Sequence, residues 1–233
     1  MNEPITISPA VGMSAIGVII ALYLLYYVVR WLYEKRQEEK EGQAAVRSAK
    51  SYRRRLIENK QYDLLELDEN DVVTVRGMGR SITRISVRVR SRVMKSIFVV
   101  VLPGTYFVST GSHQNMVARA RHAFQLAAHS TVTFEIAATC INAHNPIPTE
   151  RDRFDGVARV SDEMVRFLER TIGENEMVVQ AGVWAISDGL SKWDVQKRLS
   201  ATNAQGTRQP AISDGDVSRA RSILMELGIR NRL

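Results

Sequence analysis

Residues 81–93 read SITRISVRVRSRV, and along this stretch apolar positions alternate with polar, mostly arginine-bearing positions. Successive side chains of a β-strand point to opposite faces, so this alternation predicts a half-buried strand with one basic face. The basic face carries Arg84, Arg88, Arg90 and Arg92. Because arginine pairs bidentately with carboxylate and phosphate groups, these side chains are candidate contacts for an acidic partner or for anionic lipid headgroups. The alternative is a solvated strand edge, where charge deters aggregation.

Further short alternating or apolar runs lie on both sides of this stretch. They are VVTV at 72–75, followed by GMG at 77–79, then SIFVVVLPGTYFVST at 96–110 and TVTFEIAATCIN at 131–142. The GMG run reads as a turn after a strand, and Pro103-Gly104 as a turn between two strands. Several short strands separated by turns predict an antiparallel, β-sandwich-like domain.

The remainder of the chain has helix signals. Ser161 is a good N-cap and Gly173 a good stop, and a second helix is expected from about Asn175 to Ser187. Ser191 with Asp194 forms a capping box for a third helix, and Ser213 or Asp214 caps a last one. The predicted fold class is therefore α+β, with a C-terminal helical segment that packs on the β domain.

The N-terminal region contains an uncharged apolar run at 11–29, VGMSAIGVIIALYLLYYVV. A membrane-spanning helix needs about 20 such residues, so the run predicts an N-terminal transmembrane helix. An interface belt of aromatic rings is expected at Tyr26, Tyr27, Trp31 and Tyr33. Small residues that allow close helix packing are Gly12, Gly17 and Ala21.

The distribution of Lys and Arg predicts the orientation of this helix. None precedes the apolar run, whereas many follow it, including the cluster Arg53-Arg54-Arg55, a candidate contact for lipid headgroups or an acidic protein. This asymmetry favours a bacterial inner-membrane protein with its N-terminus outside and its domain in the cytoplasm. The single cysteine, Cys140, excludes an internal disulfide and agrees with a reducing compartment. The alternative is a domain on the periplasmic side.

These patterns divide the chain into four segments. They are a tail and transmembrane helix at 1–33, a polar basic helix at 34–61, an antiparallel β domain at 62–158 and a helical segment at 159–233.

Enzyme signatures are missing from the sequence. It has no Gly-rich phosphate loop, no G-x-S-x-G elbow and no HExxH motif. Cys140 and His144 have metal-ligand spacing, but no second pair completes a zinc site. We therefore expect a non-enzymatic protein without a cofactor, a metal ion or a small-molecule substrate.

The stretch from about Val99 to Leu199 resembles a poorly characterised bacterial module that is mostly exported. The resemblance rests on four short motifs: Pro103-Gly104-Thr105-Tyr106-Phe107, Gln114–Val117, Cys140-Ile141-Asn142, and Val179-Gln180 with Trp184. The module is in turn similar to surface thioester domains, in which a Cys and a Gln side chain form an internal thioester. The resemblance implies that Cys140 and Gln180 would form this pair, and that the domain would lie outside the cytoplasm.

The leading functional hypothesis is a non-catalytic accessory subunit of a multi-subunit membrane complex, such as a photosynthetic reaction-centre–antenna or respiratory assembly. It would dock against other membrane-protein subunits through its transmembrane helix and its basic face, and so stabilise them. The net charge of +7 agrees with an acidic partner. The first alternative is a membrane-anchored adhesion or ligand-binding module with a Cys–Gln thioester. The second is a membrane-tethered nucleic-acid-binding protein, which is disfavoured because no aromatic residue stands among the arginines to stack on bases.

Overall fold

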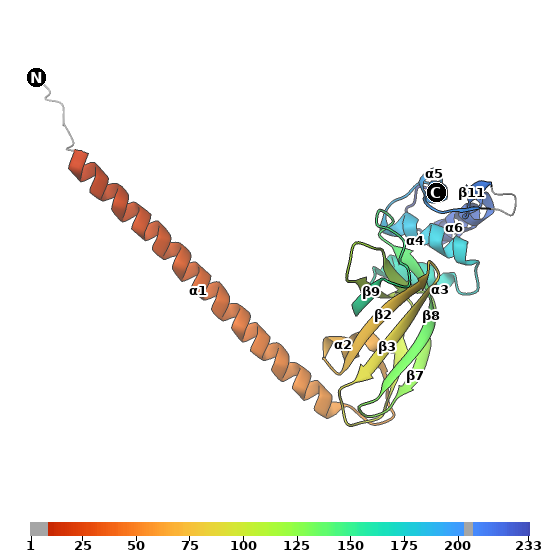
Figure 1. The fold of residues 1–233 in the computed structure, drawn as a ribbon, viewed down its shortest axis with the longest axis horizontal. Helices are drawn as coiled ribbons and strands as arrows, with labels where there is room; N and C mark the ends of the chain where they lie inside the picture. The colour runs from red at the N-terminus through yellow and green to blue at the C-terminus, as the bar shows by residue number, and fades with distance from the viewer. Residues whose placement is uncertain (1–8, 203–206) are drawn as a thin grey trace, which may run out of the picture. The chain divides into compact units, whose positions relative to one another are not determined.

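The computed structural model describes residues 9–202 and 207–233, and the side chains of 9–19, 21 and 202 lie outside the description (Figure 1). The chain divides into two compact units, Met1–Ser51 and Tyr52–Leu233. The first unit consists of the greater part of helix α1 (Pro9–Arg55). The second unit holds every other helix and strand.

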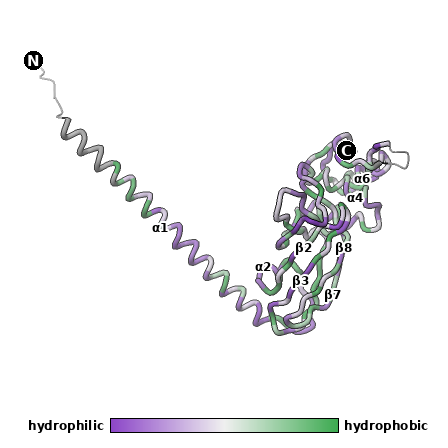
Figure 2. Tube along the Cα trace, viewed as in Figure 1, coloured by the Kyte–Doolittle hydropathy of each residue, from purple (hydrophilic) through white to green (hydrophobic). Residues whose placement is uncertain are grey.

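The prediction of a single-pass transmembrane helix is contradicted, because no helix in the described part of the chain combines the length and the apolar character that crossing a membrane requires. Among the residues whose side chains are described, the apolar part of α1 covers only 20 and 22–29, which is shorter than the roughly 20 residues that a membrane span needs. From there α1 continues without a break into a long charged segment (Figure 2). Charge begins at Arg30, whose Nε lies 2.8 Å from Glu34 Oε1. Gly12, Gly17 and Ala21, expected to pack against another helix, lie outside the residues whose side chains are described.

The predicted β-sandwich is also wrong, because the strands close into a six-stranded barrel in the order β2-β3-β8-β6-β5-β9. Its strands are β2 (Val73–Ser81), β3 (Arg84–Ser91), β5 (Thr105–Ser109), β6 (Asn115–Ala118), β8 (Thr131–Ile141) and β9 (Arg153–Arg159). Closure depends on β9, which pairs with β2 on one edge and with β5 on the other. A sandwich would have left those edges open.

Strand β2 is longer than the sequence predicts, because its glycines are part of the strand and form no turn. An added Cβ on Gly77 would lie 3.0 Å from Ile85 Cδ1 and from Phe154 Cβ. At Gly79 the added atom would lie 2.4 Å from the carbonyl oxygen of Thr149. Both glycines therefore allow neighbouring segments to approach the strand closely, which is a recognised use of glycine inside a sheet.

A small three-stranded sheet accompanies the barrel. It consists of β1 (Gln61–Asp63), β4 (Ile97–Val101) and β7 (His122–Leu126), and β4 lies in the centre, parallel to β1 and antiparallel to β7. The short helix α2 (Leu64–Glu69) follows β1 directly. Buried residues of these elements, such as Leu64, Val99 and Leu126, share one hydrophobic cluster with the barrel interior.

A layer of helices packs against one end of the barrel (Figure 1). It consists of α3 (Asp162–Arg170), α4 (Glu176–Ser187), α5 (Lys192–Arg198) and α6 (Asp214–Glu226), with the hairpin of β10 (Ser200–Thr202) and β11 (Arg208–Pro210). The predicted caps are confirmed at Ser161, Ser191 and Ser213, whose side chains accept hydrogen bonds from the first turn of their helices. The fully buried Trp184 belongs to the hydrophobic cluster of this layer, which Val117 and Ile141 of the barrel join.

An arginine-lined groove as the candidate binding site

Two paired rows of side chains on the outer wall of the barrel bring arginines together. In one row Thr74 of β2, Arg90 of β3 and Thr131 of β8 lie opposite one another. In the next row the corresponding residues are Arg76, Arg88 and Thr133. The strand alternation places these residues outside because Val75, Val87 and Val89 between them are buried in the barrel.

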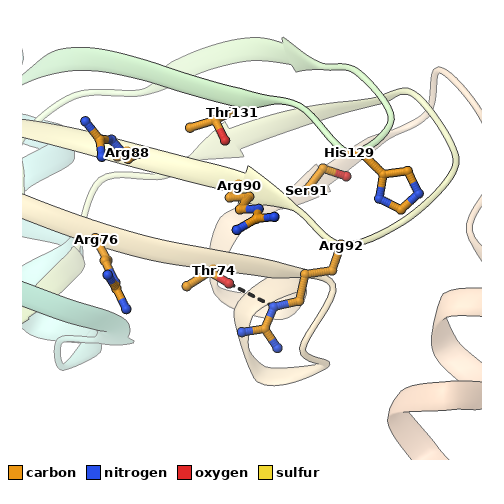
Figure 3. A pocket seen from close by; sticks show the side chains of 8 residues that line it. All are labelled: Thr74, Arg76, Arg88, Arg90, Ser91, Arg92, His129 and Thr131. Atoms are coloured by element: carbon orange, nitrogen blue, oxygen red, sulfur yellow. Dashed lines mark hydrogen bonds between the residues drawn. The ribbon is translucent and has the colours of Figure 1, made fainter.

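The rows border a hollow of about 710 Å³ (Figure 3). It is lined by Thr74, Arg76, Arg88, Arg90, Ser91, Arg92, His129 and Thr131. A second hollow of about 430 Å³ shares Arg76 and Arg88 with the first and continues toward Arg80 and Arg153. We call the two hollows together the arginine groove.

One arginine at each end of the groove has a carboxylate partner within the chain. At one end Arg92 pairs with Asp71, and its Nε donates to Thr74 Oγ1 at 2.8 Å. At the other end Arg80 lies 3.1 Å from Glu135 and 3.6 Å from Glu150. Arg92 and Arg80 are therefore neutralised locally, whereas Arg153 donates to the backbone carbonyls of Glu150 and Asp152.

The central arginines Arg76, Arg88 and Arg90 differ from those at the ends. Within the described residues, the side chain of none of the three takes part in a hydrogen bond or an ion pair, and all three are exposed. Arg76 lies opposite Asp155 of β9 without forming an ion pair with it. Arg76 and Arg88 are also direct cross-strand neighbours, an arrangement of like charges that destabilises a sheet by a few tenths of a kcal/mol up to about 1 kcal/mol. The groove thus holds uncompensated positive charge at its centre.

Not every predicted arginine belongs to the groove. Arg88, Arg90 and Arg92 line it, whereas Arg84, at the start of β3, is exposed and lines neither hollow. Arg53 pairs with Asp71, the same carboxylate that Arg92 binds. Arg54 and Arg55 are exposed.

Arg76, Arg80 and Arg153 contribute to the groove although the sequence did not single them out. Arg76 and Arg80 were missed because the two glycines between them read as a turn. Arg153 lies beyond β8 in the chain, and only barrel closure brings it to β2, where it lies opposite Met78. The alternation of β2 beyond residue 75 was the one available signal for Arg76.

The predicted interface belt lies on α1. Tyr26, Tyr27, Trp31 and Tyr33 are all exposed. The ammonium group of Lys35 lies over the Trp31 ring, 5.2 Å from its centroid.

Cys140 and Gln180 do lie together, at the contact between the barrel and the helical layer. Gln180 Oε1 accepts hydrogen bonds from Cys140 N at 3.0 Å and from Thr139 Oγ1 at 2.7 Å, while Nε2 donates to Cys140 O at 2.8 Å. The pairing of β8 with β3 stops at Arg84, where β3 begins, and past that point the Gln180 amide bonds to the free edge of β8. The Cys140 thiol contacts the Ile82 carbonyl, with Sγ and O 3.7 Å apart. Burial raises the pKa of this thiol to about 12, so it is protonated at neutral pH.

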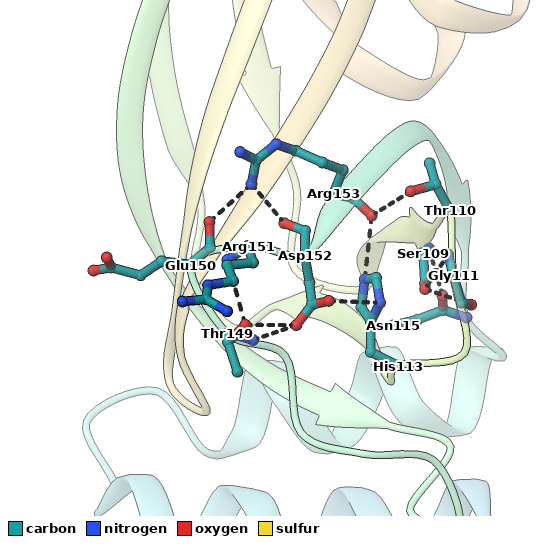
Figure 4. A network of polar contacts seen from close by, with 10 residues as sticks. All are labelled: Ser109, Thr110, Gly111, His113, Asn115, Thr149, Glu150, Arg151, Asp152 and Arg153. Atoms are coloured by element: carbon teal, nitrogen blue, oxygen red, sulfur yellow. Dashed lines mark hydrogen bonds and ion pairs between the residues drawn. The ribbon is translucent and has the colours of Figure 1, made fainter.

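A polar network joins the loop at 109–115 to the loop at 149–153 (Figure 4). His113 Nδ1 lies 3.4 Å from Asp152 Oδ1, and Nε2 lies 3.2 Å from Arg153 O. Hydrogen bonds from Thr149, first from its backbone N–H and then from its hydroxyl, lower the pKa of Asp152. Both nitrogens of the buried His113 ring face acceptors on the second loop, so the network holds the two loops together.

In the described part of the chain no cluster of three His, Cys, Asp or Glu side chains has the arrangement to hold a metal ion. Fold and groove together define the chain as a closed β-barrel with a helical layer and a basic groove on the barrel wall. Comparison with protein-family models, curated proteins and solved structures found no match to this chain.

Proposed function

We propose that this chain is a non-catalytic docking subunit of a larger assembly, and that the arginine groove binds an acidic face of a neighbouring subunit. The observation that carries the proposal is the set of central arginines, Arg76, Arg88 and Arg90, which lie side by side without a bonded partner among the described residues. Isolated surface cations are common. A like-charge pair in direct cross-strand contact costs stability, and binding of an acidic partner compensates for this cost.

The apolar segment of α1 gives a second reason to place the chain in an assembly. From Leu22 to Val29 the side chains are at least half exposed, although they include leucine, valine and tyrosine in succession. Consecutive residues cover every side of a helix, so this segment is apolar all round. A helix of that kind is stable when other apolar groups cover it. We infer that a partner subunit covers it.

Charge reversal in the groove tests the proposal. The variant Arg76→Glu/Arg88→Glu/Arg90→Glu is compared with Arg166→Glu/Arg221→Glu/Arg230→Glu, which makes the same change in net charge at exposed positions in or next to the helical layer. Tagged full-length chains are isolated gently from the native cells, and their partners are identified and quantified by mass spectrometry. We expect the control to keep a partner at the wild-type stoichiometry and the groove variant to lose it.

Two outcomes would contradict the proposal. One is a wild-type chain that runs alone at native ionic strength with undiminished stability. The other is a groove variant that keeps its partner. Restoration of binding by the opposite charge reversal on the partner's acidic face would identify the contact directly.

The hydrogen bonds between the Gln180 amide and the backbone of Cys140 favour a second candidate function, an adhesion or ligand-binding module with an internal thioester. The Cys140 thiol itself contacts the Ile82 carbonyl, so it would have to turn toward Gln180. In that reaction Cys140 Sγ would bond to the amide carbon of Gln180, and the amide nitrogen would leave as ammonia. The two hydrogen bonds to Gln180 Oε1 are suited to stabilising the oxygen of such an intermediate. The barrier is the protonated thiol, which is a poor nucleophile.

Intact-mass spectrometry distinguishes a thioester between Cys140 and Gln180 from the two unreacted side chains. A thioester lowers the mass of the chain by one ammonia, and methylamine then adds to the acyl carbon of Gln180. A Cys140→Ala variant, which cannot form the bond, is the control. An unchanged wild-type mass without a methylamine adduct would eliminate this second function and leave the docking proposal intact.

A further inference from the structure

We propose that the groove binds an extended segment of the acidic partner, with carboxylates at every second residue, laid along β3. This inference rests on the proposed docking function and adds the form of the ligand. It follows from the pairing of β3, from the spacing of its outward side chains and from the carboxylates that the chain itself places at the two ends of the groove.

The pairing of β3 excludes recognition through its backbone. One edge is bonded to β2 from Val73 to Ser81, and the other to β8 from Thr131 to Ala137. A bound segment cannot add itself as a strand to an edge that is already paired. It contacts only side chains on the outer face, so the spacing of those side chains decides which segment fits.

The outward side chains of β3 and the following residue repeat at the spacing of an extended chain. Arg88, Arg90 and Arg92 are two residues apart, which in a strand is about 7 Å. An extended peptide repeats its same-face side chains at the same interval, so its alternate residues keep register with successive arginines. An α-helix is about 10–12 Å wide with its side chains, whereas neighbouring strands of the sheet lie about 5 Å apart. An extended segment therefore follows one strand more closely than a helix does.

The carboxylates already bound at the ends show which acceptor these arginines take. Asp71 is held by Arg92, which also donates to the Thr74 hydroxyl. Arg90 and Arg88 have comparable neighbours, since Thr131 and Thr133 lie opposite them on β8. The centre of the groove therefore repeats the arginine–threonine arrangement of its end, but within the described residues no carboxylate binds there.

The lining favours carboxylate over nucleic acid. No Phe, Tyr or Trp lines either hollow, and His129 is the one ring at the border of the larger one. Binding of single-stranded nucleic acid depends strongly on bases stacked on aromatic rings. Charge pairing alone remains in the groove, and it suits a run of carboxylates.

Fluorescence anisotropy with the full-length chain tests this inference. Two labelled peptides of identical composition are compared, one with glutamate at every second position and one with the same glutamates consecutive, at low and at physiological salt. We expect the alternating peptide to bind roughly tenfold more tightly. Arg88→Gln and Arg90→Gln should each weaken it several-fold, while Arg84→Gln, on the same strand but outside the groove, leaves binding unchanged.

The failures of this inference and of the proposed function are distinguishable. Equal binding of both peptides through Arg88 and Arg90 would overturn the extended, alternating form but keep an acidic partner. If charge reversal abolishes binding of the native partner but neither peptide binds, the extended, alternating form is likewise overturned and the acidic partner is kept. Tighter binding of a single-stranded oligonucleotide or of anionic lipid vesicles than of either peptide, through the same arginines, would overturn both the inference and the acidic-protein partner.

Discussion

Asp68 shows how a single half-buried carboxylate affects the barrel. It belongs to α2, and its Oδ2 accepts a hydrogen bond from Val157 N of β9 at 3.3 Å. Burial raises the pKa of Asp68, and nearby Asp155 adds to the rise, although the bond from Val157 opposes it. The folded chain therefore binds the Asp68 proton more tightly than the unfolded chain does.

This difference predicts a pH-dependent gain in stability for Asp68→Asn. Because the unfolded carboxyl ionises first, the wild-type fold loses stability as the pH rises through the ordinary aspartate pKa of about 3.9 and on through the raised value. Asparagine keeps an acceptor for Val157 N but carries no charge. We expect a higher urea midpoint for the variant at pH 7, with the difference vanishing below about pH 3. A difference that persists undiminished in acid would show that burial of the charge is not its cause.

At the scale of elements, the contact between α3 and α4 depends on a residue without a side chain. A Cβ added to Gly182 of α4 would lie 2.0 Å from Phe167 Cζ of α3, and Phe167 is fully buried. Gly182 is thus the position at which the two helices approach most closely for packing.

Gly182→Ala should accordingly destabilise the helical layer. Phe167 would have to leave its position, and overpacking of this kind costs about 1–3 kcal/mol of unfolding free energy. Gly215→Ala in α6 is the matched control, because its added Cβ meets only Ser213 Oγ at 3.6 Å. Urea denaturation followed by tryptophan fluorescence reports both, since Trp184 lies in the same cluster. Equal midpoints for the two variants would contradict the packing argument.

The pairing of β2 with β3 connects stability to binding. Arg88 lies opposite Arg76 on one side and Thr133 on the other, so it adds repulsion to the sheet and charge to the groove. A residue retained for binding is expected to lower stability where it stands.

Arg88→Thr should therefore stabilise the fold while it weakens binding. Removing one like-charge neighbour and adding a β-branched residue is expected to raise the unfolding free energy by about 0.2–1 kcal/mol. The same substitution at Arg84, which lies opposite Ala137, should improve stability less and leave partner binding unchanged. Thermal denaturation and the partner assay are run on the same preparations. A destabilised Arg88→Thr barrel would show that the arginine has a structural role.

On the scale of the whole molecule, two hydrophobic clusters account for the folded unit. One fills the barrel and the other the helical layer, and Ile82 packs against both. The half-buried Tyr52 in the last turn of α1 and the buried Leu56, which follows the helix, belong to the first cluster. The preceding residues, Met1–Ser51, form the separate unit.

Truncation tests this division. A chain that begins at Tyr52 keeps both clusters, so we expect it to unfold at the same temperature as the second unit of the full chain. A chain that begins at Glu58 loses Leu56, whose burial is worth about 1.5–3 kcal/mol, together with the pair between Arg53 and Asp71. Circular dichroism at rising temperature compares the three chains. A chain from Tyr52 that fails to fold would contradict the independence of the second unit.

The strand at 84–91 and the caps at Ser161, Ser191 and Ser213 were predictable from the amino acids alone. Each depends on residues a few positions apart, through side-chain alternation or through a hydroxyl that bonds to the first turn of a helix. The basic face of β3 was predictable for the same reason, whereas its arginines as partner contacts stay a prediction. The resemblance of short motifs predicted that Cys140 and Gln180 form a pair, and the two residues are in contact in the fold.

Long-range packing decided the rest. Whether the strands form a sandwich or a barrel depends on β9 pairing with both β2 and β5, and no local pattern encodes which edges meet. The same pairings bring Arg76, Arg88 and Arg153 to one groove from three separate segments of the chain. Strand alternation requires only neighbouring residues, whereas barrel closure requires surfaces that match across the whole fold. The basic face is therefore determined by the local sequence, whereas the groove is determined by closure of the barrel.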